Sequence, residues 1–187
     1  MISDKQRWNE KYVSGFPMPH DTSDILKENI HLVKRGKALD IACGMGRNTH
    51  FLADEGFVVD AVDLSDFALS KVRECEEINK IETDLDTYQL EVDRYDLIVK
   101  INYLERNLFS QIIKALKKDG IFIYETFVER EGEGEGYHPS SNPAFLLKNN
   151  EVPEVFAELE IISYIERDAL NLRDEKVRVA SFVGRKV

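Results

Sequence analysis

The sequence is poor in the residues that build metal and disulfide sites. Only two of its 187 residues are cysteines, and Cys43 and Cys75 lack the C-x-x-C spacing of a zinc or redox site, so we expect both to be reduced and structural. The four histidines share no ligand spacing, and no metal is predicted. No run of about 18 apolar residues and no signal-peptide pattern is present, which predicts a cytoplasmic protein without a membrane partner.

Positive charge is the second shortage. The chain has 25 lysines and arginines against 35 aspartates and glutamates, a net charge of −10. An acidic surface repels a phosphate backbone, and no dense basic patch interleaved with aromatic residues is visible, so we expect no nucleic-acid partner. The length and the 43% of hydrophobic residues instead predict one folded domain over residues 1–187.

The most informative stretch is an apolar strand followed by a glycine turn. Residues 38–42 are apolar except for Asp40, and Gly44 and Gly46 follow immediately. Glycines allow a sharp turn or a close approach of the backbone, and an amphipathic helix then runs to Gly56. Because the start of a helix offers free N–H groups, this arrangement favours an anion or a ribose-like ligand. A tight turn without any ligand is the alternative.

A second strand, residues 57–63, ends in an acidic residue. Asp63 lies 17 positions beyond Gly46, close to the spacing at which dinucleotide-binding folds place a carboxylate on the ribose hydroxyls. Gly44, Gly46 and Thr49 spell G-x-G-x-x-T, however, so the third glycine of the dinucleotide fingerprint is missing. This departure counts against a nicotinamide-dependent oxidoreductase.

The segment Asp-Ile-Ala-Cys-Gly-Met-Gly at 40–46, taken with Val-Asp-Leu-Ser at 62–65, resembles the first motifs of class I S-adenosylmethionine-dependent methyltransferases. Over nearly the whole chain the sequence looks most like the small tellurite-resistance (TehB-like) members. The resemblance implies S-adenosyl-L-methionine as cofactor. It also implies the cofactor-binding residues, which are Trp8, Tyr12, Asp40, Ala42, Gly44, Gly46, Asn48, Asp63, Leu64, Asp84, Leu85 and Asn102.

The remaining pattern predicts alternating helices and strands. Helices are expected at residues 3–12, 23–34, 66–78, 105–118 and 151–157, and further strands at 81–83, 95–101 and 121–127. Residues 159–165 and 177–183 alternate with period two, as an antiparallel pair does. We therefore predict an α/β fold: a Rossmann-like, seven-stranded, mostly parallel sheet with a C-terminal antiparallel hairpin and helices on both faces.

The chemistry is expected just past the strand at 95–101, because ligands bind at the carboxyl ends of strands in open α/β sheets. The catalytic residues stay unknown, with Asn102, Tyr103 and His138 as candidates. Methyltransferases that act on the amine of a DNA base carry Asn/Asp-Pro-Pro-Tyr after this strand; here no proline follows Asn102, so the resemblance does not extend to them, which argues against methylation of a base amine. We expect Lys100 to extend to the rim or to touch substrate, and Glu125 to be a strand-end ion-pair partner rather than a base.

Two segments are expected to cover the site. By resemblance, a helical cap over residues 1–35 folds over the cofactor, and the loop 128–150, with its Glu-Gly repeat at 131–136, covers the substrate. The predicted reaction transfers a methyl group to a small-molecule acceptor: a thiol, a metalloid oxyanion or a small metabolite. A non-catalytic S-adenosylmethionine-binding module that recruits a partner is an alternative, and both a monomer and a homodimer stay open.

Overall fold

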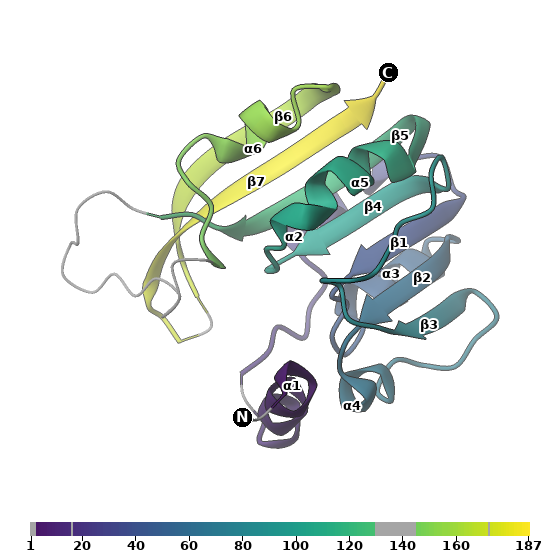
Figure 1. The fold of residues 1–187 in the computed structure, drawn as a ribbon, viewed down its shortest axis with the longest axis vertical. Coiled ribbons are helices and arrows are strands. Elements are labelled where there is room, and N and C mark those ends of the chain that lie inside the picture. The colour runs from purple at the N-terminus through teal and green to yellow at the C-terminus, as the bar shows by residue number, and fades with distance from the viewer. Residues whose placement is uncertain (1–2, 16, 130–144, 172) are drawn as a thin grey trace.

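The computed structural model describes residues 3–15, 17–129, 145–171 and 173–187 (Figure 1). Within these residues, seven strands form one sheet in the order β3-β2-β1-β4-β5-β7-β6. The strands are β1 (Lys37–Ile41), β2 (Val58–Asp63), β3 (Ile78–Glu82), β4 (Tyr95–Ile101), β5 (Leu116–Phe127), β6 (Leu159–Leu170) and β7 (Lys176–Lys186). The helices are α1 (Asp4–Val13), α2 (Asp24–Asn29), α3 (Arg47–Asp54), α4 (Asp66–Leu69), α5 (Phe109–Ala115) and α6 (Glu151–Val155), with two 3-10 turns, η1 (Ile30–Leu32) and η2 (Arg106–Leu108).

The pairing of the strands confirms the predicted sheet. Strands β3, β2, β1, β4 and β5 run parallel to their neighbours, whereas β7 pairs antiparallel with both β5 and β6. β1 lies between β2 and β4, so the chain leaves it towards one edge of the sheet and later returns on its other side. A ligand site is expected at this switch point, beyond the carboxyl ends of β1 and β4.

Each face of the sheet carries its own apolar cluster. Alternate strand residues point to opposite faces, so Leu39 and Ile98 pack with α5 and α6, whereas Ala38 and Val99 pack with α2, α3 and α4. Figure 1 shows α5 and α6 on the near side of the sheet and α3 behind β1. Helices on both faces are therefore confirmed.

Several predicted boundaries are wrong. The helix expected over residues 66–78 is a single turn, α4, which ends at Leu69, since Ile78 already pairs with Val59 of β2 as the start of β3. The helix expected over 105–118 ends at Ala115, since Leu116 already pairs with Tyr95 across an irregularity between β4 and β5. The helix expected over 23–34 divides into α2 and η1, and β6 and β7 are both longer than predicted.

No helix in the described part of the chain has the length and apolar character to cross a bilayer.

Candidate functional site

The glycine turn after β1 has the backbone conformation that its sequence predicts. Ala42, Gly44 and Gly46 all have positive φ angles, of 55°, 56° and 85°. A Cβ atom added to Gly46 would lie 2.9 Å from Cγ2 of Val72, and one added to Gly44 would lie 2.9 Å from the hydroxyl of Tyr12. The positive φ therefore favours glycine at both positions, and at Gly46 the close contact with Val72 adds to that preference.

Asp40, the residue that interrupts the apolar run of β1, is fixed against the first turns of α3. Its side chain is 2% exposed, and Oδ2 accepts a hydrogen bond of 2.6 Å from the Thr49 hydroxyl. Burial raises the pKa of Asp40 to about 7, although the bond from Thr49 opposes this. Thr49 stands where the dinucleotide fingerprint has its third glycine, and here its hydroxyl binds the carboxyl group instead.

Asp63, the last residue of β2, joins the glycine turn to the next loop. Its two carboxylate oxygens accept N–H bonds of 2.8 Å from Gly44 and of 2.8 Å from Ser65. Burial raises the pKa of Asp63, and these backbone bonds oppose the shift. Ser65 then caps α4, because its hydroxyl accepts from the Ala68 N–H. Leu64, between them, is half-buried.

Helix α1 is held over this edge by polar contacts. None of its residues is buried. The Asn9 side chain accepts a hydrogen bond from the Ser65 hydroxyl and donates one of 2.8 Å to Asp66, and Lys5 forms an ion pair of 2.5 Å with Glu82 at the end of β3. Since these contacts are partly exposed, the helix is bound to the domain more weakly than a core helix would be.

The aromatic pair of α1 lies on its inner side. The ring centroids of Trp8 and Tyr12 are 6.1 Å apart, and both side chains are partly buried. Burial and the neighbouring carboxylate of Asp63 raise the pKa of Tyr12, whose hydroxyl lies directly over Gly44. The structure thus places the Tyr12 hydroxyl at the glycine turn, with Trp8 beside Tyr12 on the helix; a cap over the cofactor stays a prediction.

The other predicted cofactor residues take different positions. At the end of β3, Leu85 is buried and Asp84 is exposed, with Oδ1 accepting the N–H of Asp86 at 3.0 Å. Asn48 is buried on α3, where its side-chain oxygen accepts both the N–H and the hydroxyl of Ser23 at 3.0 and 3.1 Å. The structure therefore gives the Asn48 oxygen a role in holding the start of α2.

The end of β4 completes the edge. Asn102 is exposed and has a φ of 57°, and its N–H donates to the carbonyl of Glu125 at 2.8 Å. Ala42 and Asn102 thus hold left-handed conformations at the ends of adjacent strands, an arrangement that is often found at ligand sites. Tyr103 is half-buried, and burial followed by the charges of Asp86 and other acidic neighbours raises the pKa of its hydroxyl.

The prediction that Lys100 reaches the rim is wrong. Its side chain is fully buried, and Nζ donates to the carbonyl of Glu105 at 3.1 Å. The amine is retained inside because the turn after β4 folds back over it and supplies this acceptor.

The partners of the charged groups at the end of β5 were not found from the sequence. Glu125 accepts hydrogen bonds from the Ser181 hydroxyl and from the Arg167 guanidinium at 3.0 Å, so it is the ion-pair partner that we expected. Arg47, the first residue of α3, donates to the Asp21 carbonyl at 2.8 Å and experiences the charges of Asp40 and Glu125. No sequence signal identified these partners, because they come from segments far apart in the chain.

His138 lies outside the described residues, as do residues 130–144 of the predicted loop 128–150. The two described flanks of that stretch are held together at the end of β5. Val128 and Leu147 form a parallel bridge, and the Glu129 N–H donates to the Leu147 carbonyl at 2.8 Å.

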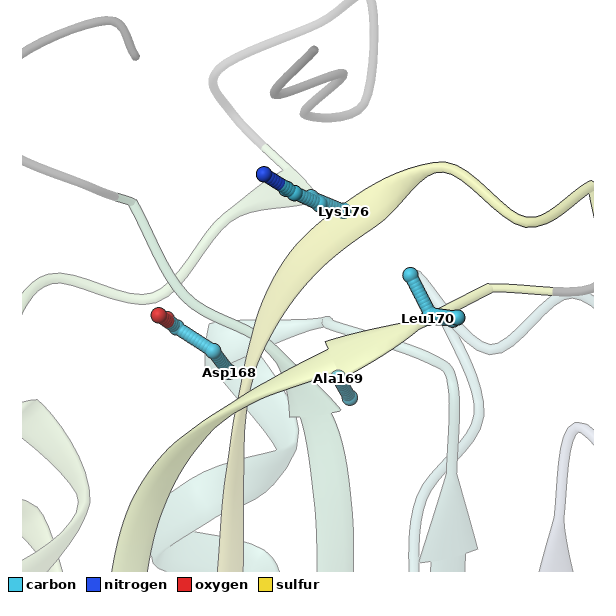
Figure 2. A pocket seen from close by; sticks show the side chains of 4 residues that line it. All are labelled: Asp168, Ala169, Leu170 and Lys176. Atoms are coloured by element: carbon cyan, nitrogen blue, oxygen red, sulfur yellow. The ribbon is translucent and has the colours of Figure 1, made fainter. Parts of the chain in front are cut away.

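A separate surface hollow lies at the hairpin end of β6 and β7, lined by Asp168, Ala169, Leu170 and Lys176 (Figure 2). Strands β4 and β5 separate this hairpin from β1. Its lining contains one acidic, one basic and two apolar residues, and we assign it no role. Nor does the described part of the chain contain a group of three His, Cys, Asp or Glu side chains that could bind a metal ion.

Comparison with known proteins places the chain in a family. The family model described as "Tellurite resistance protein TehB" matches residues 1–177. The probable S-adenosyl-L-methionine-dependent methyltransferase TehB of Haemophilus influenzae is 26% identical over 165 residues, which cover 80% of this chain and 57% of that protein. The chain spans about half the length of the curated relatives it matches.

Solved structures share the fold. The crystal structure of TehB from Haemophilus influenzae superposes with a TM-score of 0.75 at 18% identity, covering 96% of this chain and 67% of that one. A S-adenosylmethionine-dependent methyltransferase from Methanosarcina mazei superposes with a TM-score of 0.70 at 14% identity, covering 89% and 99%. Since the family model covers nearly the whole sequence, the chain belongs to the TehB family of tellurite resistance proteins.

Proposed function

We propose that the protein is a S-adenosyl-L-methionine-dependent methyltransferase whose cofactor lies along the ends of β1, β2 and β4. One observation carries the proposal: the carboxyl groups of Asp40 and Asp63 are buried on adjacent parallel strands, and that of Asp63 accepts the Gly44 N–H in a turn where Gly44 and Gly46 are closely packed. The family relationship supports the same activity.

The residues present fit this cofactor. Asp63 keeps lone pairs beyond its two backbone bonds and is suited to ribose hydroxyls. Leu85 and Asp84 would flank the adenine, and Asp40 would lie near the methionine end. Trp8 and Tyr12 would cover the cofactor from α1. Their ring faces are a favourable environment for a positively charged sulfonium.

The acceptor is proposed to be a small molecule: a thiol, a metalloid oxyanion or a small metabolite. When bound, S-adenosylmethionine supplies a methyl group on an excellent leaving group, so a soft or anionic nucleophile needs no general base. The chain's own contribution is then to align the acceptor and exclude water. Arg47 and Arg167 lie near Glu125 and provide positive charge at this edge, and the net charge of −10 makes a nucleic-acid acceptor unfavourable.

The test is calorimetric titration with S-adenosylmethionine, S-adenosylhomocysteine and the nicotinamide dinucleotides in parallel. We expect binding of the first two alone, accompanied by a change in the fluorescence of Trp8, the single tryptophan of the chain. Screening thiols, metalloid oxyanions and small carboxylates for methyl transfer should then identify the acceptor. Nicotinamide binding would favour an oxidoreductase, and tight cofactor binding without any turnover would favour a module that recruits a partner.

A further inference from the structure

Lys100 is a buried ionisable group that the proposed reaction does not use. It is the penultimate residue of β4, on the face packed against α5, and its side chain is 0% exposed. Removing an amine from water is unfavourable unless it gains compensating contacts. Ile98, two residues earlier on the same face, shows that an apolar side chain packs well there. Filling the core therefore does not explain a lysine at this position.

The surroundings of Lys100 supply those contacts. Besides the bond to the Glu105 carbonyl, its Nζ lies 4.6 Å from the ring centroid of Phe109, 4.9 Å from that of Tyr124 and 5.6 Å from that of Tyr103. Aromatic faces offset part of the cost of burying a cation. The Tyr124 hydroxyl is itself buried without a hydrogen-bond partner among the described residues. Lys100 thus occupies an aromatic enclosure with one directed contact, to the turn after β4.

That turn closes the β4 side of the proposed cofactor site. It runs from Asn102, with its positive φ angle, to Glu105, whose side chain accepts the Asn107 N–H at 2.9 Å and so begins η2. Its second residue is Tyr103, whose ring centroid lies 5.6 Å from the Lys100 amine. The turn follows β4 directly, and Lys100 of β4 is paired with Ile41 of β1, so the turn lies at the same edge of the sheet as the glycine turn. A shift of the turn would therefore move Tyr103 at the edge assigned to the cofactor.

We propose that Lys100 is a positioning residue: its amine, bonded to the Glu105 carbonyl inside the aromatic enclosure, holds the 102–105 turn, and with it Tyr103, at the cofactor edge. The effect on cofactor binding rests on the proposed function. The role of Lys100 in holding the turn rests only on the contacts of its side chain.

Burial of the amine, more than its charged neighbours, determines the direction of the pH effect. Burial lowers the pKa of Lys100 to about 7, Arg106 of η2 acts in the same direction, and Glu105 and Glu151 of α6 oppose it. Tyr103 and Tyr124 face the amine as neutral rings. A lysine in water keeps its proton to well above pH 9, so conformations that expose Lys100 gain stability relative to the closed turn as the pH falls towards 7. The closed turn, and cofactor affinity with it, should strengthen as the pH rises above 7.

The experiment compares the wild type with Lys100→Met, Lys100→Gln and a surface control, Lys118→Met, from about pH 6 to about pH 9. Two quantities are measured: amide hydrogen exchange over residues 102–108 without ligand, corrected for intrinsic rates, and the affinity for S-adenosylhomocysteine. For the wild type and the control, amide protection and affinity for S-adenosylhomocysteine should both increase as the pH is raised above 7. At the upper end, Lys100→Met should lose affinity on the order of tenfold, as when a buried carbonyl loses its donor. Lys100→Gln, which keeps a donor, should recover part of this loss, and neither variant at position 100 should retain the pH dependence.

Each other outcome is decisive. If Lys100→Met keeps wild-type protection, affinity and pH dependence, Lys100 only fills the core and the proposal is wrong. If exchange increases while affinity is unchanged, the turn is not coupled to the cofactor and the proposal is equally overturned. If the wild type does not bind S-adenosylhomocysteine at all, the proposed function fails, and the exchange data alone then decide whether Lys100 holds the turn. Lys100→Gln covers the case in which Lys100→Met does not fold.

Discussion

Replacing Asp63 with asparagine should weaken both the fold and the proposed cofactor site. Each carboxylate oxygen accepts one backbone N–H, from Gly44 and from Ser65, both at 2.8 Å. Asparagine has a single acceptor oxygen, so one buried N–H would face the amide group without a partner. An unsatisfied buried donor costs about 1–3 kcal/mol, and we expect the free energy of unfolding to fall by that amount.

The same substitution removes the charged acceptor assigned to the ribose hydroxyls. A hydrogen bond to a charged group is worth about 1.5–3 kcal/mol, which corresponds to a loss of affinity of roughly tenfold to a hundredfold. Urea denaturation followed by circular dichroism measures the stability, and calorimetric titration with S-adenosylhomocysteine measures the affinity. The titration is made where both proteins are folded, so that the two effects are separated.

A matched control is Asp54→Asn at the end of α3. Asp54 forms an exposed ion pair with Arg73, which solvent screens, so we expect little loss of stability and no change in affinity. A folded Asp63→Asn variant that binds S-adenosylhomocysteine as tightly as the wild type would refute the ribose assignment. Unchanged stability would refute the view that both backbone bonds are needed.

Three further predictions concern other parts of the site. Lys100→Met should raise the free energy of unfolding by about 2–4 kcal/mol below pH 7. Removing the buried charge, whose pKa is lowered from 10.5 to about 7, stabilises the fold by at most about 5 kcal/mol, and the Glu105 carbonyl left without a donor costs about 1–3 kcal/mol of that gain. This gain should shrink as the pH rises from 7 towards 10.5, where only the unfolded lysine is protonated, and denaturation across that range measures it. Gly46→Ala should lower the free energy of unfolding by about 2–4 kcal/mol in thermal or urea denaturation, because a strained φ and a close contact both contribute. Gly15→Ala, with a φ of 70° and open space around it, should lower it by only about 1 kcal/mol, and equal losses would contradict the packing argument. Asn9→Ala removes the contacts of α1 with Ser65 and Asp66, so the cofactor should dissociate several-fold faster in stopped-flow Trp8 fluorescence, and an unchanged rate would show that α1 does not cover the site.

The fold could be predicted because its signals are local. Alternating apolar runs and glycine turns indicate strands and helices within short windows, and the strand–turn–helix unit at residues 37–54 follows directly from such a window. The wrong boundaries occur where a long-range contact overrides local propensity. Leu116 would continue a helix by its own pattern, but its pairing with Tyr95 ends α5 early.

The site could be predicted in part. Asp40, Gly44, Gly46 and Asp63 meet at one edge because parallel strands end together, which sequence spacing already implies. The cofactor contacts of the twelve named residues stay a prediction, as does any role of His138. The bond between Asn48 and Ser23 gives the Asn48 oxygen a structural function that the sequence did not indicate.

The sequence by itself determined the order of the strands and helices and the glycine turn, since both depend on side-chain periodicity and on backbone angles that few residues adopt. Only the tertiary structure decided the partners of the charged groups. The Arg167–Glu125 pair joins residues 42 positions apart, and the amine of Lys100 is enclosed by rings from three separate segments. Such contacts depend on strand register and on how the turns fold back over the sheet, which no local pattern specifies.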